Sequence, residues 1–187
     1  MNSIKIYSRT VFDQDPVWDS SFKIVFMLKG DLSIFIGTKE RHLYEHDITF
    51  VFPFELHGGI TAREGCKALI ISIGPELWNI LYPNLDKISF SSNILRPNDW
   101  LSSHAFICSC ISRIIYYTQN SGESSNARIC SAVSDILADL TENYSYSKPS
   151  QKSVDQNFSR IHDILKYIVD NYNHHFSLDD ISKDIGF

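Results

Sequence analysis

The chain has 187 residues, of which 43% are hydrophobic and 21% are charged, and its formal net charge is -5. This apolar content excludes an intrinsically disordered chain, and no apolar run approaches the ~18 residues that a membrane-spanning helix needs. Aspartate and glutamate (22) outnumber lysine and arginine (17), so the chain lacks the basic surface typical of a stand-alone nucleic-acid-binding protein. The start of the chain carries no secretory signal pattern. We therefore expect a cytoplasmic protein with one domain and a smaller second part.

The first half of the chain carries short runs rich in isoleucine, valine and phenylalanine, separated by turn residues. Six runs cover residues 22–28, 32–36, 41–44, 48–52, 59–62 and 67–73, and residues 4–7 add a leading strand or arm. Strands of this length at intervals of about ten residues indicate a small antiparallel sandwich or barrel. The phenylalanines at positions 26, 35, 50, 52 and 54 predict a barrel filled with side chains.

In the second half, apolar residues recur at intervals of three and four, which is typical of helices buried on one face. The spacing predicts helices over residues 99–118 and 127–144, and hence an α+β fold in which an amphipathic helix pair follows the barrel. The apolar stripe of the later helix consists of Ile129, Val133, Ile136, Leu140 and Tyr144. We expect this stripe to form the contact face of a homodimer, or else to pack on the barrel; the sequence does not decide between the two.

The last forty residues have their own pattern. A polar stretch without apolar period predicts a linker at 148–157, between a first domain at 1–147 and a second part at 158–187. Helical spacing resumes over 158–172. Ser177, with Asp180 three residues on, predicts the capped start of a short helix, and Gly186 predicts its left-handed end. Helices this short need packing partners, so we expect residues 158–187 to be the front portion of a larger domain.

The segments RIHDILKYIVDNY (160–172) and FSLDDISKDIGF (176–187) resemble the opening of the DNA-binding domain of AraC-type bacterial transcription regulators. Ser182 stands where that family usually has alanine, and Gly186 and Phe187 match its turn. In the family, the recognition helix that enters the major groove comes next. The resemblance implies an incomplete helix-turn-helix domain without DNA-binding residues in this chain, so that DNA is a partner of the full-length protein only.

The first half is similar to the cupin-like sensor domain that precedes the DNA-binding domain in many members of that family. The matching segments are VFMLKG (25–30) and HDITFVFPFELH (46–57), with His46 in place of the usual glycine. The resemblance implies a cupin-like barrel that binds a small-molecule effector, such as a sugar or a small anion. It also implies a homodimer whose DNA binding the effector modulates.

Cupin enzymes hold a divalent metal with three histidines and a glutamate. By this resemblance Lys23 takes the glutamate position, Trp18 and Pro16 take histidine positions, and only His57 matches. An ammonium supplies neither a donor atom nor the negative charge that a metal needs, and the spacing of the four cysteines fits neither a zinc knuckle nor a disulfide scaffold. We therefore expect no metal, no cofactor and no catalytic residue. A metal-dependent cupin enzyme remains one alternative, and a dimerisation module without a ligand remains another.

The same positions predict a ligand site. Alternation along a strand places Lys23 on one face with Val25 and Met27. Together with Trp18 and His57 they would line the mouth of the barrel, and Arg9 would reach over it from the leading arm. An aromatic plate with hydrogen-bonding groups suits a small polar or anionic solute. The structural alternatives are a Lys23 that extends to the rim, a His57 that is satisfied in the core and a Trp18 that plugs the barrel.

Overall fold

The computed structural model describes residues 3–10, 16–37, 39–62, 65–83, 85, 89–90, 94–97, 103–146, 163–164, 167–168 and 171–186. The chain divides into two compact units, residues 1–147 and 148–187. The proposed linker at 148–157 lies outside the described residues.

The strands of the first unit pair in antiparallel fashion, as predicted, and the α+β class is confirmed. One sheet has the order β1 (Ile4–Arg9), β7 (Lys67–Ile73), β2 (Phe22–Lys29), β5 (Ile48–Val51), β9 (Ile94–Leu95). A second has the order β4 (Lys39–Leu43), β3 (Leu32–Ile36), β6 (His57–Ala62). Two short strands, β8 (Ser89–Phe90) and β10 (Ser145–Tyr146), pair with each other. The strand predicted at 59–62 begins two residues earlier, which makes His57 its first residue.

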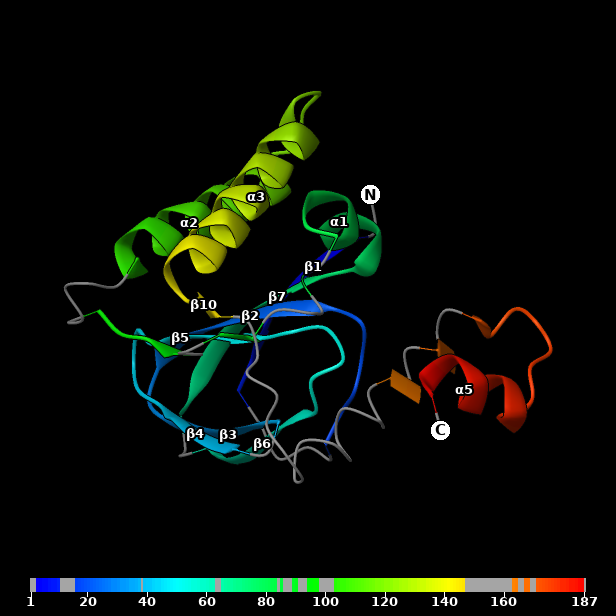
Figure 1. Ribbon diagram of the computed structural model, residues 1–187. Helices are drawn as coiled ribbons and strands as arrows, with labels where there is room; N and C mark the ends of the chain where they lie inside the picture. The colour runs from blue at the N-terminus through cyan, green and yellow to red at the C-terminus, as the bar shows by residue number, and fades with distance from the viewer. Residues whose placement is uncertain are drawn as a thin grey trace. The chain divides into compact units, whose positions relative to one another are not determined.

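The five-stranded sheet is the middle layer of the first unit (Figure 1), with helices over one face and the three-stranded sheet over the other. Alternate residues of β2 point to opposite sides. Phe22 and Ile24 belong to the core beneath the helices, whereas Val25 and Met27 belong to the core between the sheets. The fold therefore has two apolar cores that share one sheet.

The interior between the sheets is filled with side chains, but Phe26, Phe50 and Phe52, which suggested this filling, pack on the helix side instead. Phe50 and Phe52 lie in the helix-side core, where Phe22 stacks on Phe50 with ring centroids 6.0 Å apart, and Phe26 packs against the same core. The interior between the sheets is instead lined by aliphatic side chains and a cysteine. Its buried apolar members are Val25, Met27, Leu32, Ile34, Ile36, Leu43, Val51, Cys66, Ala68 and Ile70.

Two long helices cover the outer face of the middle sheet, α2 (His104–Gln119) and α3 (Ser125–Asn143). A third helix, α1 (Pro75–Leu81), was not predicted, because seven residues are too few to show a helical period. The predicted helix start at residue 99 lies outside the described residues. Among the described helices none is both long and apolar enough to cross a bilayer.

The apolar stripe of α3 packs within the chain, so its assignment as a dimer face needs correction. Val133 and Ile136 are 0% exposed and Leu140 is 1% exposed in the helix-side core. Ile129 and Tyr144 are partly buried against that core, and the Tyr144 hydroxyl accepts a hydrogen bond from the Ser103 amide at 2.9 Å. The stripe thus covers the outer face of the five-stranded sheet. This is the second of the two predicted arrangements, in which the stripe packs on the barrel.

In the second unit the predicted caps of α5 (Leu178–Ile185) are confirmed. The Ser177 hydroxyl accepts from the Asp180 amide at 3.3 Å, and the Asp180 carboxylate accepts from the Ser177 amide at 2.8 Å. Gly186 ends the helix with φ 78°, a conformation that glycine adopts without steric cost. Most of the helix predicted at 158–172 lies outside the described residues, but those that are described up to Asn171 are helical.

Candidate functional site

Three of the five residues predicted to bind a ligand share the inner face of the middle sheet. Lys23 lies opposite Ser72 of β7 and Val51 of β5, and Met27 lies opposite Ala68, which in turn pairs with Arg9. Directly paired residues point to the same side. Arg9, Lys23 and Met27 therefore all face the interior between the sheets, with Arg9 and Met27 at one level and Lys23 four residues along β2.

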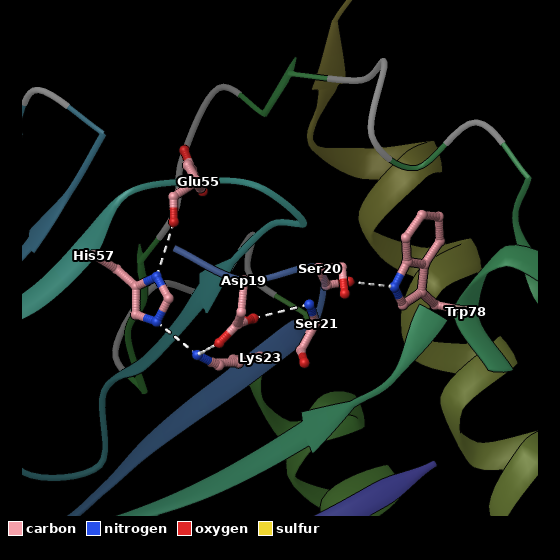
Figure 2. Close-up of polar contacts among 7 residues, drawn as sticks. All are labelled: Asp19, Ser20, Ser21, Lys23, Glu55, His57 and Trp78. Atoms are coloured by element: carbon pink, nitrogen blue, oxygen red, sulfur yellow. Dashed lines mark hydrogen bonds and ion pairs between the residues drawn. The ribbon is translucent and has the colours of Figure 1, made fainter. Parts of the chain in front are cut away.

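Lys23 and His57 meet across the gap between the two sheets (Figure 2). The Lys23 Nζ lies 2.6 Å from His57 Nε2, and the lysine side chain is only 11% exposed. The same ammonium forms an ion pair with the carboxylate of Asp19. One cation is thus shared between an imidazole of the smaller sheet and a carboxylate of the segment that leads into β2.

The hydrogen bonds of His57 fix its protonation. Its Nδ1 lies 2.8 Å from the Glu55 carbonyl, which only accepts, so Nδ1 carries the proton and Nε2 accepts from Lys23. Burial lowers the pKa of His57, and the neighbouring Lys23 and Arg9 cations lower it further, against the opposing effects of the bond to Glu55 and the charge of Asp19. The imidazole is therefore neutral near pH 7.

Asp19 is the main residue of the site that the sequence analysis missed. Its second oxygen accepts from the Ser21 amide at 2.8 Å, which closes a short turn ahead of β2. Burial alone would raise the pKa of Asp19, but the hydrogen bonds from Lys23 and Ser21 outweigh it, and the pKa lies below its usual value. The carboxylate is therefore ionised. An aspartate four residues before a lysine is too common to have marked it.

The segment that carries Asp19 is attached on three sides. Val17 and His57 exchange both backbone hydrogen bonds, at 2.7 and 3.0 Å. The Asp19 carbonyl accepts from the Phe54 amide at 2.8 Å, and the Ser20 carbonyl accepts from the indole of Trp78 at 2.8 Å (Figure 2). Since Trp78 is a buried residue of α1, this last bond links the site to the helix layer.

Two further predicted residues, Trp18 and Arg9, lie near this cluster. Trp18 neighbours Val17, and its indole nitrogen is enclosed and has no hydrogen-bond partner among the described residues. The Arg9 guanidinium lies 5.5 Å from the ring centroid of Tyr7. Burial raises the pKa of Tyr7, although Arg9 opposes it. Tyr7 was also missed; its place on the inner face follows from the register of β1.

The donor set does not fit a divalent metal. Within the described ranges, no three histidine, cysteine, aspartate or glutamate side chains are grouped so as to hold one. The Nε2 of His57, the predicted remnant of the ligand set, already accepts from an ammonium, and a cation there would oppose a second one. All four cysteines are free; Cys66 and Cys110 are buried, and Cys108 and Cys130 are partly exposed.

The fold is similar to those of AraC-like regulators of known structure. The AraC-like transcriptional activator CuxR matches with a TM-score of 0.53 and 13% identity, over 90% of this chain and 58% of CuxR. ToxT from Vibrio cholerae with a bound unsaturated fatty acid matches with a TM-score of 0.55 and 12% identity, over 97% of this chain and 68% of ToxT. ToxT bound to (E)-4-(8-methylnaphthalen-1-yl)but-3-enoic acid matches with a TM-score of 0.54 and 12% identity, over 98% and 71%.

At the level of sequence, no protein family and no curated protein matches the chain. The chain also spans only 58% of the length of CuxR. What these structural matches share with this chain is the arrangement of its elements. The chain therefore has the fold of the AraC-like transcription regulators, as its sequence resemblance predicted.

Proposed function

We propose that this chain is the effector-binding part of a bacterial transcription regulator. A small molecule held between the two sheets of the first unit would modulate DNA binding by a homodimer of the regulator. The observation that carries the proposal is the meeting of Lys23 and a neutral His57 at the edge of an aliphatic interior. A buried ammonium beside apolar side chains is a means of recognising a ligand, because a polar group there orients what the apolar residues enclose.

The chemistry of the interior favours an organic acid with an apolar body. Val25, Met27 and Ile70 offer contact area but no hydrogen bonds, which suits a hydrocarbon better than the many hydroxyl groups of a sugar. Lys23 supplies a charge-assisted hydrogen bond to a carboxylate. Among the proteins of similar fold, ToxT binds acids of this kind.

The other predicted residues take supporting roles in the proposal. Met27 would contact the apolar body of the ligand, since its flexible thioether adapts to irregular shapes. Arg9 would add positive charge to the inner face. The enclosed indole N–H of Trp18, which has no acceptor among the described residues, would donate to an oxygen of the ligand.

Titration calorimetry with sodium oleate below its micellar concentration tests this function. We expect the wild-type chain to bind oleate and Lys23→Met to bind it at least about tenfold more weakly, because the variant loses a charge-assisted bond. Lys67→Met, which removes an exposed lysine of β7, serves as the matched control and should bind like the wild type. Equal binding by the two variants, or no binding by the wild type, would contradict the proposal.

A further inference from the structure

The Lys23 ammonium, which is proposed to bind the ligand, already has a partner of opposite charge. It is paired with Asp19, an acidic residue of the same chain. The two partners differ in their surroundings, because the side chain of Lys23 is 11% exposed and that of Asp19 is 35% exposed. The carboxylate thus approaches the enclosed ammonium from the more open side.

A ligand carboxylate and Asp19 compete for the same cation. Two ionised carboxylates a few ångströms apart repel each other, so each weakens the binding of the other to a shared ammonium. Since His57 is neutral and accepts from Lys23, it provides no second positive charge. Binding of an ionised acid to Lys23 is therefore opposed for as long as the Asp19 carboxylate stays at this ammonium.

Asp19 is also the partner that is able to leave. Lys23 is held in the middle sheet by pairing on both sides, to β5 and to β7. Asp19 precedes β2, and its side chain is held by Lys23 and by the Ser21 amide. Rotation of the Asp19 side chain into solvent breaks only its bonds to Lys23 and the Ser21 amide, whereas the more enclosed Lys23 side chain is also held by His57.

Building on the function proposed above, we propose that Asp19 is the specificity-determining residue of the site, an internal carboxylate that an incoming acid must displace from Lys23. An acid without an apolar body exchanges one ion pair for another and gains little. An acid with an apolar body also buries hydrocarbon between the sheets, which favours displacement. Asp19 thereby makes the site selective for long acids over short ones.

Acetate and oleate, titrated separately and followed by the backbone amide signals of residues 22–27, test this inference. We expect Asp19→Asn to bind acetate at least about tenfold more tightly than the wild type, because the competing charge is gone while the side chain keeps its size and its acceptor for Ser21. Adding Lys23→Met to Asp19→Asn should abolish the gain. Asp135→Asn removes an ion-paired carboxylate of α3, the partner of Arg113, and should match the wild type.

Equal acetate binding by the wild type and Asp19→Asn, absence of acetate binding to both, or weaker binding by the variant would overturn the role of Asp19. A gain that survives Lys23→Met would overturn it too. If Asp19→Asn does not fold, Asp19→Ser, which also keeps an acceptor for the Ser21 amide, replaces it. Oleate separates the two proposals: a gain for acetate without any oleate binding supports Asp19 and refutes the ligand class, whereas oleate binding without a gain for acetate does the reverse.

Discussion

The imidazole of His57 donates one hydrogen bond and accepts another, and only its neutral form can do both at once. Nδ1–H donates to the Glu55 carbonyl, and Nε2 accepts from Lys23. Protonation of Nε2 would place two cations against each other within a mostly buried cluster. Protonation of His57 in the folded protein therefore weakens the contacts that hold Lys23, His57 and Asp19 together.

This arrangement predicts a loss of stability as the pH falls below neutrality. Burial and Lys23 lower the pKa of His57 below its ordinary value of 6.5, so the unfolded chain takes up the proton at a higher pH than the folded chain. The contribution of His57 is fully present above pH 6.5 and is lost as the pH falls through the pKa of the folded state. Urea unfolding across this range should show a steeper loss for the wild type than for His57→Gln. His175→Gln, on an exposed position before α5, controls for loss of an imidazole; equal slopes for the wild type and His57→Gln would refute the interpretation.

The indole of Trp78 is the residue-scale link between the site and the helices. Trp78→Phe should destabilise the chain by about 1–3 kcal/mol, because it removes the donor to the Ser20 carbonyl and leaves a gap in the helix-side core. It should also increase hydrogen exchange at the amides of residues 19–21, which lose one of their three attachments. Exchange that rises uniformly over the whole chain would mean that the bond is not what holds this segment.

Some contacts of the site could be predicted from the sequence, and others could not. Strand alternation correctly placed Lys23 with Val25 and Met27, because a period of two is a local property. The resemblance to a known sensor domain brought His57 to the same interior. Asp19 reaches Lys23 through a turn whose shape depends on the Ser21 amide, and Tyr7 depends on the register of β1 with β7. Neither of these follows from composition or spacing.

At the scale of elements, an apolar stripe on a helix predicts that this face of the helix is buried, but it does not identify the partner that buries it. The stripe of α3 fits a dimer contact and packing on the sheet equally well as a pattern; three-dimensional packing decides for the sheet. The same holds for the phenylalanines, because their number predicted an apolar core but did not show in which of the two cores each ring would pack. The caps of α5 were predictable because Ser177, Asp180 and Gly186 act within a single turn. The helix α1 and the two-residue strands are too short for any period.

The placement of the α3 stripe predicts how a truncation within it behaves. Ile136→Ala should lower the free energy of unfolding by about 2–5 kcal/mol, because it leaves a cavity in the helix-side core. The loss should be the same at every protein concentration, since the contact is intramolecular. The matched variant Ser134→Ala, on the exposed side of α3, should change stability by less than about 0.5 kcal/mol. If the loss in free energy of unfolding grows on dilution, the stripe is a contact between subunits instead.

At the scale of the whole molecule, one sheet connects the candidate site to the helices. Lys23 and Val25 of β2 face the interior, while Phe22 and Ile24 of the same strand support the helices. A ligand that shifts β2 or the segment before it therefore acts on both cores at once. Such coupling needs a difference in ligand affinity between two arrangements of the unit, and displacement of Asp19 would supply one.

Both apolar cores lie inside the first unit, which predicts that residues 1–147 fold by themselves. The fully buried members of the two cores fall between Phe22 and Leu140, and the strand β10 that pairs with β8 ends at Tyr146. A protein cut after residue 147 should keep the near-ultraviolet circular dichroism of the full chain and unfold cooperatively, with a Tm within about 5 °C of it. A cut after residue 135 removes Ile136, Leu137 and Leu140 from the helix-side core and should abolish cooperative unfolding. If the 1–147 protein fails to unfold cooperatively while the full chain does, the first unit depends on the second, and residues 148–187 contribute to its stability rather than forming a separate unit.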